Sequence, residues 1–134
     1  MLLGVHTPTM FLGKKKIYRV VELTERWCGK HLGRNYDRGG LTIYILKQSM
    51  WEVPTYGGYE ESNNSITIYK NRCESVTELI MAVVHEYVHY LQDLSQYDKL
   101  TKQYGYENNP LEVEARITAQ KYYEIIWEKI KNKI

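Results

Sequence analysis

The sequence predicts an α+β domain in which a small three-stranded sheet packs on helices. Apolar residues recur at helical spacing near the N-terminus, in the middle of the chain and at the C-terminus. Between the first and second of these stretches lie three short runs that are compatible with strands and are separated by turn residues. A chain of 134 residues with 43% hydrophobic content forms one core, so we expect a single domain, residues 1–134.

The first element is an N-terminal helix from about Ile17 to Leu32. Its apolar residues recur at helical spacing, and Gly33 follows as a stop signal. The apolar positions are Val20, Val21, Leu23, Trp27 and Leu32. We expect this helix to support the sheet.

The strands are expected at Leu41–Leu46, Tyr56–Glu60 and Ser65–Tyr69. Glycines precede the first run, and a polar turn at residues 61–64 precedes the last. The pair Gly57-Gly58 indicates a bulge or a close approach of another backbone. If the second strand is an edge, it could hold an extended substrate by backbone pairing, or it could be a glycine-rich hairpin without such a role.

The second helix is expected from Ser75 to Asp93. Ser75 followed by Glu78 is typical of a capping box. A broad apolar stripe follows it, formed by Val76, Leu79, Ile80, Val83, Val84, Tyr87, Val88 and Leu91. This helix carries the sequence His-Glu-Tyr-Val-His at positions 85–89.

Two histidines spaced i, i+4 on a helix share one face, so the rings of His85 and His89 can converge on one zinc ion. Glu86 then lies where a carboxylate can take a proton from a water on the metal. The alternative is a core helix whose histidines only form hydrogen bonds. The paired histidines with a glutamate between them favour the metal site.

A catalytic zinc takes three protein ligands and keeps one position open, so a third ligand is needed. The remaining cysteines and histidines are isolated or lie far upstream of the motif, namely His6, Cys28, His31 and Cys73. A better source is a C-terminal helix that begins at Asn109-Pro110, a cap followed by proline at the first helical position. Its apolar stripe is Leu111, Ala115, Ala119, Tyr122, Ile126 and Ile130.

The first turns of this C-terminal helix contain Glu112 and Glu114, and either could complete the zinc site. Glu112 could instead bond back to the helix cap, because it stands three residues after Asn109. Between the two predicted helices we expect a loop rich in Gly, Asn and Tyr.

The pattern His85-Glu86-x-x-His89 followed by Glu112-x-Glu114-Ala115 resembles the gluzincin type of zincin metallopeptidase and the small zincin-like domains of bacteria and phages. The resemblance implies a minimal zincin-like fold with a zinc ion (Zn2+) held by His85, His89 and Glu112. It implies that Glu86 is the catalytic base. Arg116 occupies the place where such proteins carry an aspartate that supports a ligand histidine, and this departure leaves Glu114 open as the ligand.

The expected function is therefore a zinc-dependent metallopeptidase, in which a metal-bound water activated by Glu86 hydrolyses a peptide bond. Tyr104 and Tyr106 are weak candidates for stabilising the oxyanion. The alternative is a zincin-like domain whose metal site is structural or vestigial and which acts as a binding or regulatory module. A structural site would tolerate Glu86→Gln, whereas a catalytic site would not.

Charge and composition bound the partners. The formal net charge of +2 does not favour nucleic acid, and the lysines at 14–16 and in the C-terminal tail are expected to be solvated. No stretch is long and apolar enough for a membrane span, and no secretory signal is expected. We expect a peptide or protein substrate, a protein partner that completes the cleft of so small a domain, and a cytoplasmic location, which two distant cysteines fit.

Overall fold

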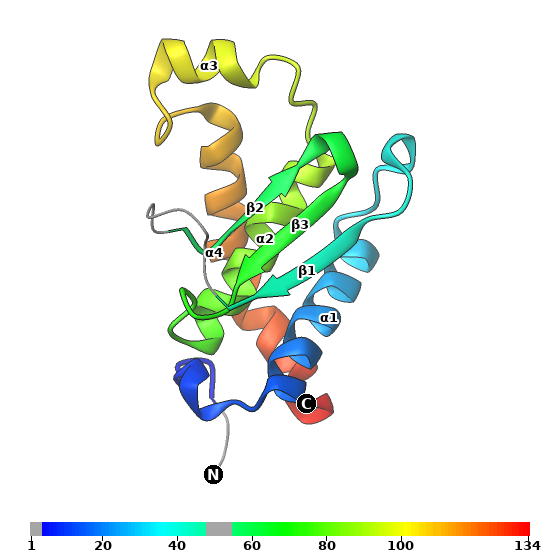
Figure 1. Ribbon diagram of the computed structural model, residues 1–134, viewed down its shortest axis with the longest axis vertical. Helices are drawn as coiled ribbons and strands as arrows, with labels where there is room; N and C mark the ends of the chain where they lie inside the picture. Colours follow the sequence, from blue (N-terminus) through cyan, green and yellow to red (C-terminus); the bar gives the residue numbers. More distant parts are fainter. Residues whose placement is uncertain (1–3, 48–54) are drawn as a thin grey trace.

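A computed structural model describes residues 4–47 and 55–134 (Figure 1). Its helices are α1 (Lys14–His31), α2 (Val76–Leu91), α3 (Tyr97–Tyr104) and α4 (Pro110–Ile130). Its strands are β1 (Thr42–Leu46), β2 (Gly57–Glu60) and β3 (Ser65–Tyr69), and short 3-10 turns link several elements. The predicted α+β class with a small three-stranded sheet is confirmed.

The sheet has the order β1-β3-β2, with β1 parallel and β2 antiparallel to the central β3. The predicted strands are confirmed. The predictions placed the starts of β1 and β2 one residue too early, at Leu41 and Tyr56. The predicted bulge is wrong, because β2 pairs with β3 in unbroken register from Gly57↔Ile68 to Glu60↔Ser65. The close approach is confirmed, since a Cβ on Gly57 would lie 2.5 Å from the Thr67 carbonyl oxygen of β3.

The N-terminal helix begins three residues earlier than predicted, at Lys14, because Gly13 is extended and acts as its N-cap. Lysines fill its exposed first turn, so the apolar spacing on which the prediction rested gave no sign of that turn. Gly33 follows the helix with φ +92°, a conformation that glycine favours, and this confirms the predicted stop.

Helix α2 begins as predicted, with Ser75 as its N-cap: the Ser75 hydroxyl accepts a 3.3 Å hydrogen bond from the Glu78 N–H. The Glu78 carboxylate bonds back to the Glu74 N–H at 2.6 Å, one residue before the cap. The helix ends at Leu91, two residues before the predicted Asp93, because Gln92 turns to an extended conformation with ψ 151°.

An arginine from outside the helix satisfies the carbonyl groups at the C-terminal end of α2. The Arg38 guanidinium donates to the carbonyl oxygens of His89, Tyr90 and Gln92 at 3.0, 2.6 and 2.6 Å. A positive charge at a helix C-terminus also complements the helix dipole. Arg38 therefore helps to hold the segment that carries His89.

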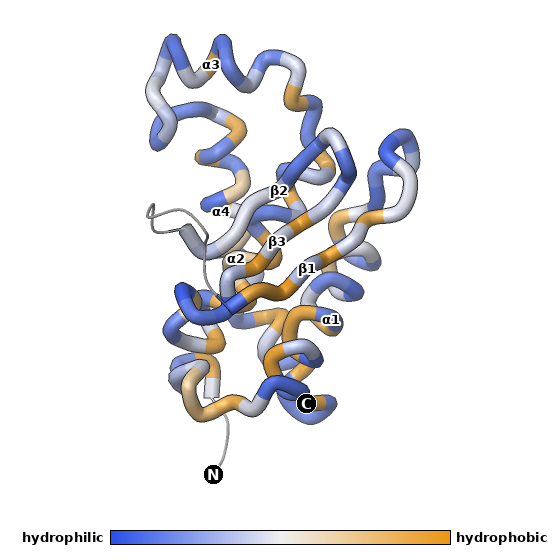
Figure 2. Tube along the Cα trace, viewed as in Figure 1, coloured by the Kyte–Doolittle hydropathy of each residue, from blue (hydrophilic) through white to orange (hydrophobic). Residues whose placement is uncertain are grey.

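Helix α2 is the centre of the fold and packs against α1, α4, β2 and β3 (Figure 1). The apolar core comes mainly from α1, α2, β3 and the second half of α4. Figure 2 shows apolar residues gathered along these elements, whereas α3 is mostly hydrophilic. Among the described helices, none combines the length and the apolar character that crossing a membrane requires.

Helix α3 occupies part of the stretch for which we expected a loop, so that part of the prediction is wrong. Its apolar residues Tyr97, Leu100 and Tyr104 do recur at helical spacing, but the stripe spans only eight residues and none of them is buried, so the pattern was too short to be recognised. Polar contacts hold it: the Asn109 side chain donates to the Tyr97 carbonyl oxygen at 3.2 Å and to the Thr101 hydroxyl at 2.9 Å. Asn109 thus links α3 to the start of α4.

Candidate metal centre

Helices α2 and α4 bring His85, His89 and Glu112 together, with one ligand atom from each lying within 4.8 Å of the others. The two oxygens of the Glu112 carboxylate face one histidine each, at 2.9 Å from His85 Nε2 and 3.0 Å from His89 Nε2. His89 and Glu112 are buried, and His85 is partly exposed. This is the set of residues that the sequence predicted to bind the metal.

Of the two glutamates that the sequence left open, Glu112 is the one that meets the histidines. The Glu114 carboxylate instead accepts a 3.0 Å hydrogen bond from the Gln92 side chain. The sequence held a signal for this choice, because Glu112 stands three and seven residues before the buried Ala115 and Ala119 and thus shares their face of α4.

Two further predictions concern the first turns of α4. The N-cap is confirmed, since the Asn109 side-chain oxygen accepts from the Leu111 N–H at 2.9 Å. The alternative prediction, that the Glu112 carboxylate bonds back to the helix cap, is wrong, because both of its oxygens face the histidines. Arg116 donates to the Glu107 carbonyl oxygen at 2.7 Å.

Hydrogen bonds control the charge of the Glu112 carboxylate. Burial by itself would raise its pKa, but hydrogen bonds with His85, His89 and Tyr97 outweigh burial and hold the pKa far below its usual range. Burial lowers the pKa of His89, yet the Glu112 and Glu86 carboxylates reverse this and raise it. The Glu112 carboxylate is therefore ionised at neutral pH, as a metal ligand would have to be.

The donor atoms fit a divalent metal ion. Two imidazole nitrogens and a carboxylate form a mixed N/O set of the kind that zinc prefers. Tetrahedral ligands about 2.0–2.1 Å from zinc lie ~3.3 Å apart. The histidine nitrogens lie 2.9 and 3.0 Å from different oxygens of the Glu112 carboxylate, and the three ligand atoms lie within 4.8 Å of one another, so side-chain rotations would bring them around one ion.

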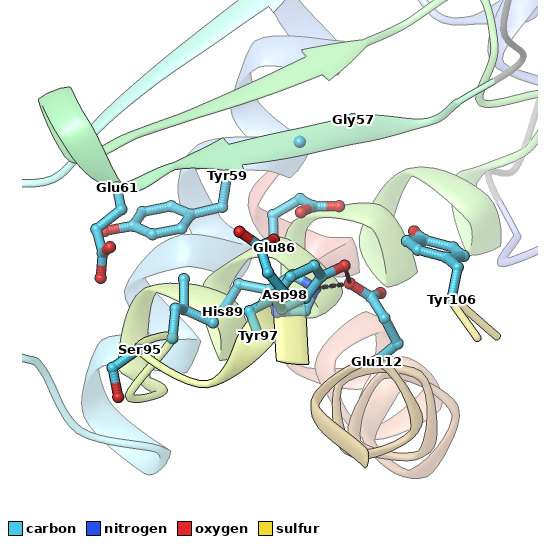
Figure 3. A pocket seen from close by; sticks show the side chains of 12 residues that line it. Gly57, Tyr59, Glu61, Glu86, His89, Ser95, Tyr97, Asp98, Tyr106 and Glu112 are labelled. Atoms are coloured by element: carbon cyan, nitrogen blue, oxygen red, sulfur yellow. Dashed lines mark hydrogen bonds and ion pairs between the residues drawn. The ribbon is translucent and has the colours of Figure 1, made fainter. Parts of the chain in front are cut away.

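Glu86 lies beside this group on α2 and beneath β2 (Figure 3). Burial raises the pKa of the Glu86 carboxyl, and the neighbouring His85 and His89 act in the opposite direction. A hydrogen bond from the Tyr59 backbone also stabilises the carboxylate. A carboxyl group with a raised pKa next to a metal site is suited to accepting and returning a proton.

The open edge of β2 faces this site. The hydrogen bond from the Tyr69 N–H to the Tyr56 carbonyl oxygen, 2.9 Å, sets the alternation of the antiparallel pair. By that alternation the backbone groups of Gly57 and Tyr59 point away from β3. The Thr55 hydroxyl agrees with this direction, since it lies on the outer side of the strand and donates to the Gly57 carbonyl oxygen at 2.8 Å.

Two cavities flank Glu86 along this edge, with volumes of about 440 and 400 Å³. Both are lined by Gly57, Glu86 and Tyr106. The first continues past His89 and Glu112 to the acidic side chains Glu61 and Asp98, and Figure 3 shows its lining. The second continues past His85 to apolar side chains that include Met81 and Ala119. The site therefore opens into an elongated cleft under a strand edge.

The tyrosines at the site differ in part from those named from the sequence. Tyr106 lines both cavities, and burial together with the charges of Glu112 and Glu86 raises its pKa to about 12. Tyr104 ends α3, half exposed, and lines neither cavity. Tyr97 was missed: its hydroxyl donates to the Glu112 carboxylate at 2.6 Å. The available signal was its helical spacing to Leu100 and Tyr104, which places it on the apolar side of α3.

Gln92 is a second residue that the sequence analysis did not single out. It is buried, and its side-chain oxygen lies 2.7 Å from His89 Nδ1. The signal available was its spacing, since a polar residue three positions after a ligand histidine can reach the same ring.

Comparisons with protein-family models, with curated proteins and with solved structures found no match to this chain. The resemblance to zincins therefore stays a prediction that depends on the motif.

Proposed function

We propose that this protein is a zinc-dependent metallopeptidase with a minimal zincin-like fold. The observation that carries the proposal is the convergence of His85, His89 and Glu112 beneath an open strand edge, with Glu86 beside them. Its donor set, the neighbouring carboxyl and the cleft are the parts that such an enzyme requires.

Each residue has a separate role in the proposed reaction. His85, His89 and Glu112 would hold the ion, which when bound supplies Lewis-acid activation of a carbonyl group and of water. Glu86 accepts the proton of the attacking water and returns it to the leaving amine, as its raised pKa favours. Tyr106 keeps its proton at neutral pH because its pKa is about 12, so its hydroxyl can donate to the developing oxyanion.

The substrate in this proposal is an extended segment of a peptide or protein. Such a segment would take the place of the Thr55 hydroxyl beside Gly57, pair with the outward backbone groups of Gly57 and with the Tyr59 carbonyl oxygen, and so add a strand to the edge of the sheet. Gly58 leaves open space beside this edge, since a Cβ there would meet nothing within 4 Å. The two cavities would then receive substrate side chains on either side of Glu86.

Zinc content tests the metal site first. Elemental analysis at matched protein concentration should find one zinc per chain in the wild type, and little in His85→Ala and Glu112→Ala. Glu114→Gln is the matched control, because it alters a glutamate of the same helix that does not meet the histidines. Wild-type protein without zinc after incubation with excess metal would overturn the proposal.

Glu86→Gln then separates catalysis from a structural site. This variant should keep its zinc and lose about 10²- to 10⁴-fold of the cleavage rate on an unstructured protein substrate. Zinc binding without any cleavage would instead favour the binding or regulatory module, and cleavage that survives Glu86→Gln would contradict the role of Glu86.

A further inference from the structure

Gln92 connects the two helices that carry the candidate metal ligands. Its side-chain oxygen lies 2.7 Å from His89 Nδ1. Its side-chain nitrogen donates to the Leu111 carbonyl oxygen at 2.9 Å and to the Glu114 carboxylate at 3.0 Å. This residue follows α2 directly, and both partners of its nitrogen belong to the first turns of α4.

These contacts determine the orientation of the Gln92 amide. The Leu111 carbonyl oxygen and the Glu114 carboxylate only accept hydrogen bonds, so the amide NH2 must face them. A flipped amide would set its oxygen against both acceptors at about hydrogen-bond distance. The side-chain oxygen of Gln92 therefore faces His89.

The orientation of the amide in turn determines the tautomer of His89. An oxygen at 2.7 Å requires a donor, so His89 Nδ1 carries a hydrogen. In the neutral ring the lone pair is then on Nε2, the atom that lies 3.0 Å from the Glu112 carboxylate. A lone pair and a carboxylate repel each other unless a proton or a metal ion lies between them.

We propose that Gln92 is a positioning residue of the metal centre, which directs the Nε2 lone pair of His89 toward the ion and couples that ring to the helix carrying Glu112. The inference rests on the proposed metal site and is independent of peptidase activity. A second role for the same contacts is a simple link between α2 and α4. The two roles depend on different atoms of the amide, because the oxygen serves His89 and the nitrogen serves the link.

Two substitutions of Gln92 distinguish the role of its side-chain oxygen from the role of its side-chain nitrogen. Glutamate at position 92 keeps an oxygen for His89 and loses the donor to Leu111, whereas methionine of similar length loses both. Both are made in a Glu114→Gln background, so that glutamate at position 92 does not face a second carboxylate. The background variant with its native Gln92 is the reference for zinc affinity.

Zinc dissociation constants are measured by competition with a chromophoric chelator, and thermal unfolding of the metal-free proteins reports on the fold. We expect Gln92→Glu to bind zinc within about threefold of the reference and Gln92→Met to bind about 10- to 100-fold more weakly. Metal-free Gln92→Glu should unfold at the same or a lower temperature than Gln92→Met, because its second oxygen faces the Leu111 carbonyl oxygen, so tighter zinc binding by Gln92→Glu would not come from a more stable fold.

Equal zinc affinity of the two double variants would overturn the positioning role, whether both match the reference or both are weakened alike. Absence of zinc binding in the wild type would overturn it as well, together with the metal site. Absence of peptide cleavage with the expected order of affinities would remove the proposed enzyme and leave the role of Gln92 standing.

Discussion

Gly57→Ala should destabilise the sheet, whereas the same change at its neighbour Gly58 should not. A Cβ on Gly57 would lie 2.5 Å from the Thr67 carbonyl oxygen and 3.2 Å from Ile68 Cδ1. At Gly58 a Cβ would meet nothing within 4 Å. Neither glycine has positive φ, so the contrast comes from space.

The carbonyl oxygen that blocks this position belongs to a strand that cannot easily move. Strand β3 pairs with β1 on one side and with β2 on the other, so relief must come from a shift of β2. Overpacking of this kind costs about 1–3 kcal/mol. For a domain of this size that corresponds to a fall in Tm of roughly 3–10 °C. Gly58→Ala should change stability by less than about 1 kcal/mol and can increase it, because alanine reduces the entropy of the unfolded chain.

Thermal unfolding in the presence of a chelator compares the two variants without a contribution from bound metal. A Gly57→Ala protein as stable as Gly58→Ala would refute the reasoning, because it would show that the edge strand adapts freely. The same result would weaken the proposed substrate edge, which depends on a strand held in register above Glu86.

Four further outcomes can be checked. Arg38→Met should lower the free energy of unfolding by about 1–3 kcal/mol in urea titrations, because the Gln92 carbonyl oxygen loses its donor while those of His89 and Tyr90 keep one other donor each, and a loss under about 0.5 kcal/mol would contradict this. The buried thiols of Cys28 and Cys73, whose pKa values burial raises to about 12, should react with a thiol reagent at pH 8 only after denaturation. Above pH 9 the unfolded chain loses these protons first, so stability should fall by roughly 1 kcal/mol per pH unit for each thiol, and a flat profile from pH 9 to 11 would count against the burial argument. Tyr97→Phe should weaken zinc binding about tenfold in chelator competition, since it removes the hydroxyl that orients Glu112, and an unchanged affinity would make that contact incidental.

Features that depend on residues a few positions apart could be predicted from the sequence. The helix carrying His85 and His89, its Ser75 cap and the strand at residues 65–69 all follow from spacing within one element. The first turn of α1 could not be predicted in this way, because its residues are exposed lysines. Helix α3 was missed for another reason: its apolar stripe of Tyr97, Leu100 and Tyr104 spans only eight residues, and none of them is buried.

By itself, the sequence determined that two imidazoles and a carboxyl share one helix and that two glutamates open another. Glu112 and Glu114 point about 200° apart around their helix axis, so only one of them can face α2. The spacing of Glu112 to Ala115 and Ala119 indicates which glutamate lies on the apolar face, and the packing of that face against the core then brings Glu112 to the histidines. The contacts of Gln92 and Tyr97 and the strand edge above Glu86 were likewise decided only by the tertiary structure, because they join elements whose separation and rotation no local pattern specifies.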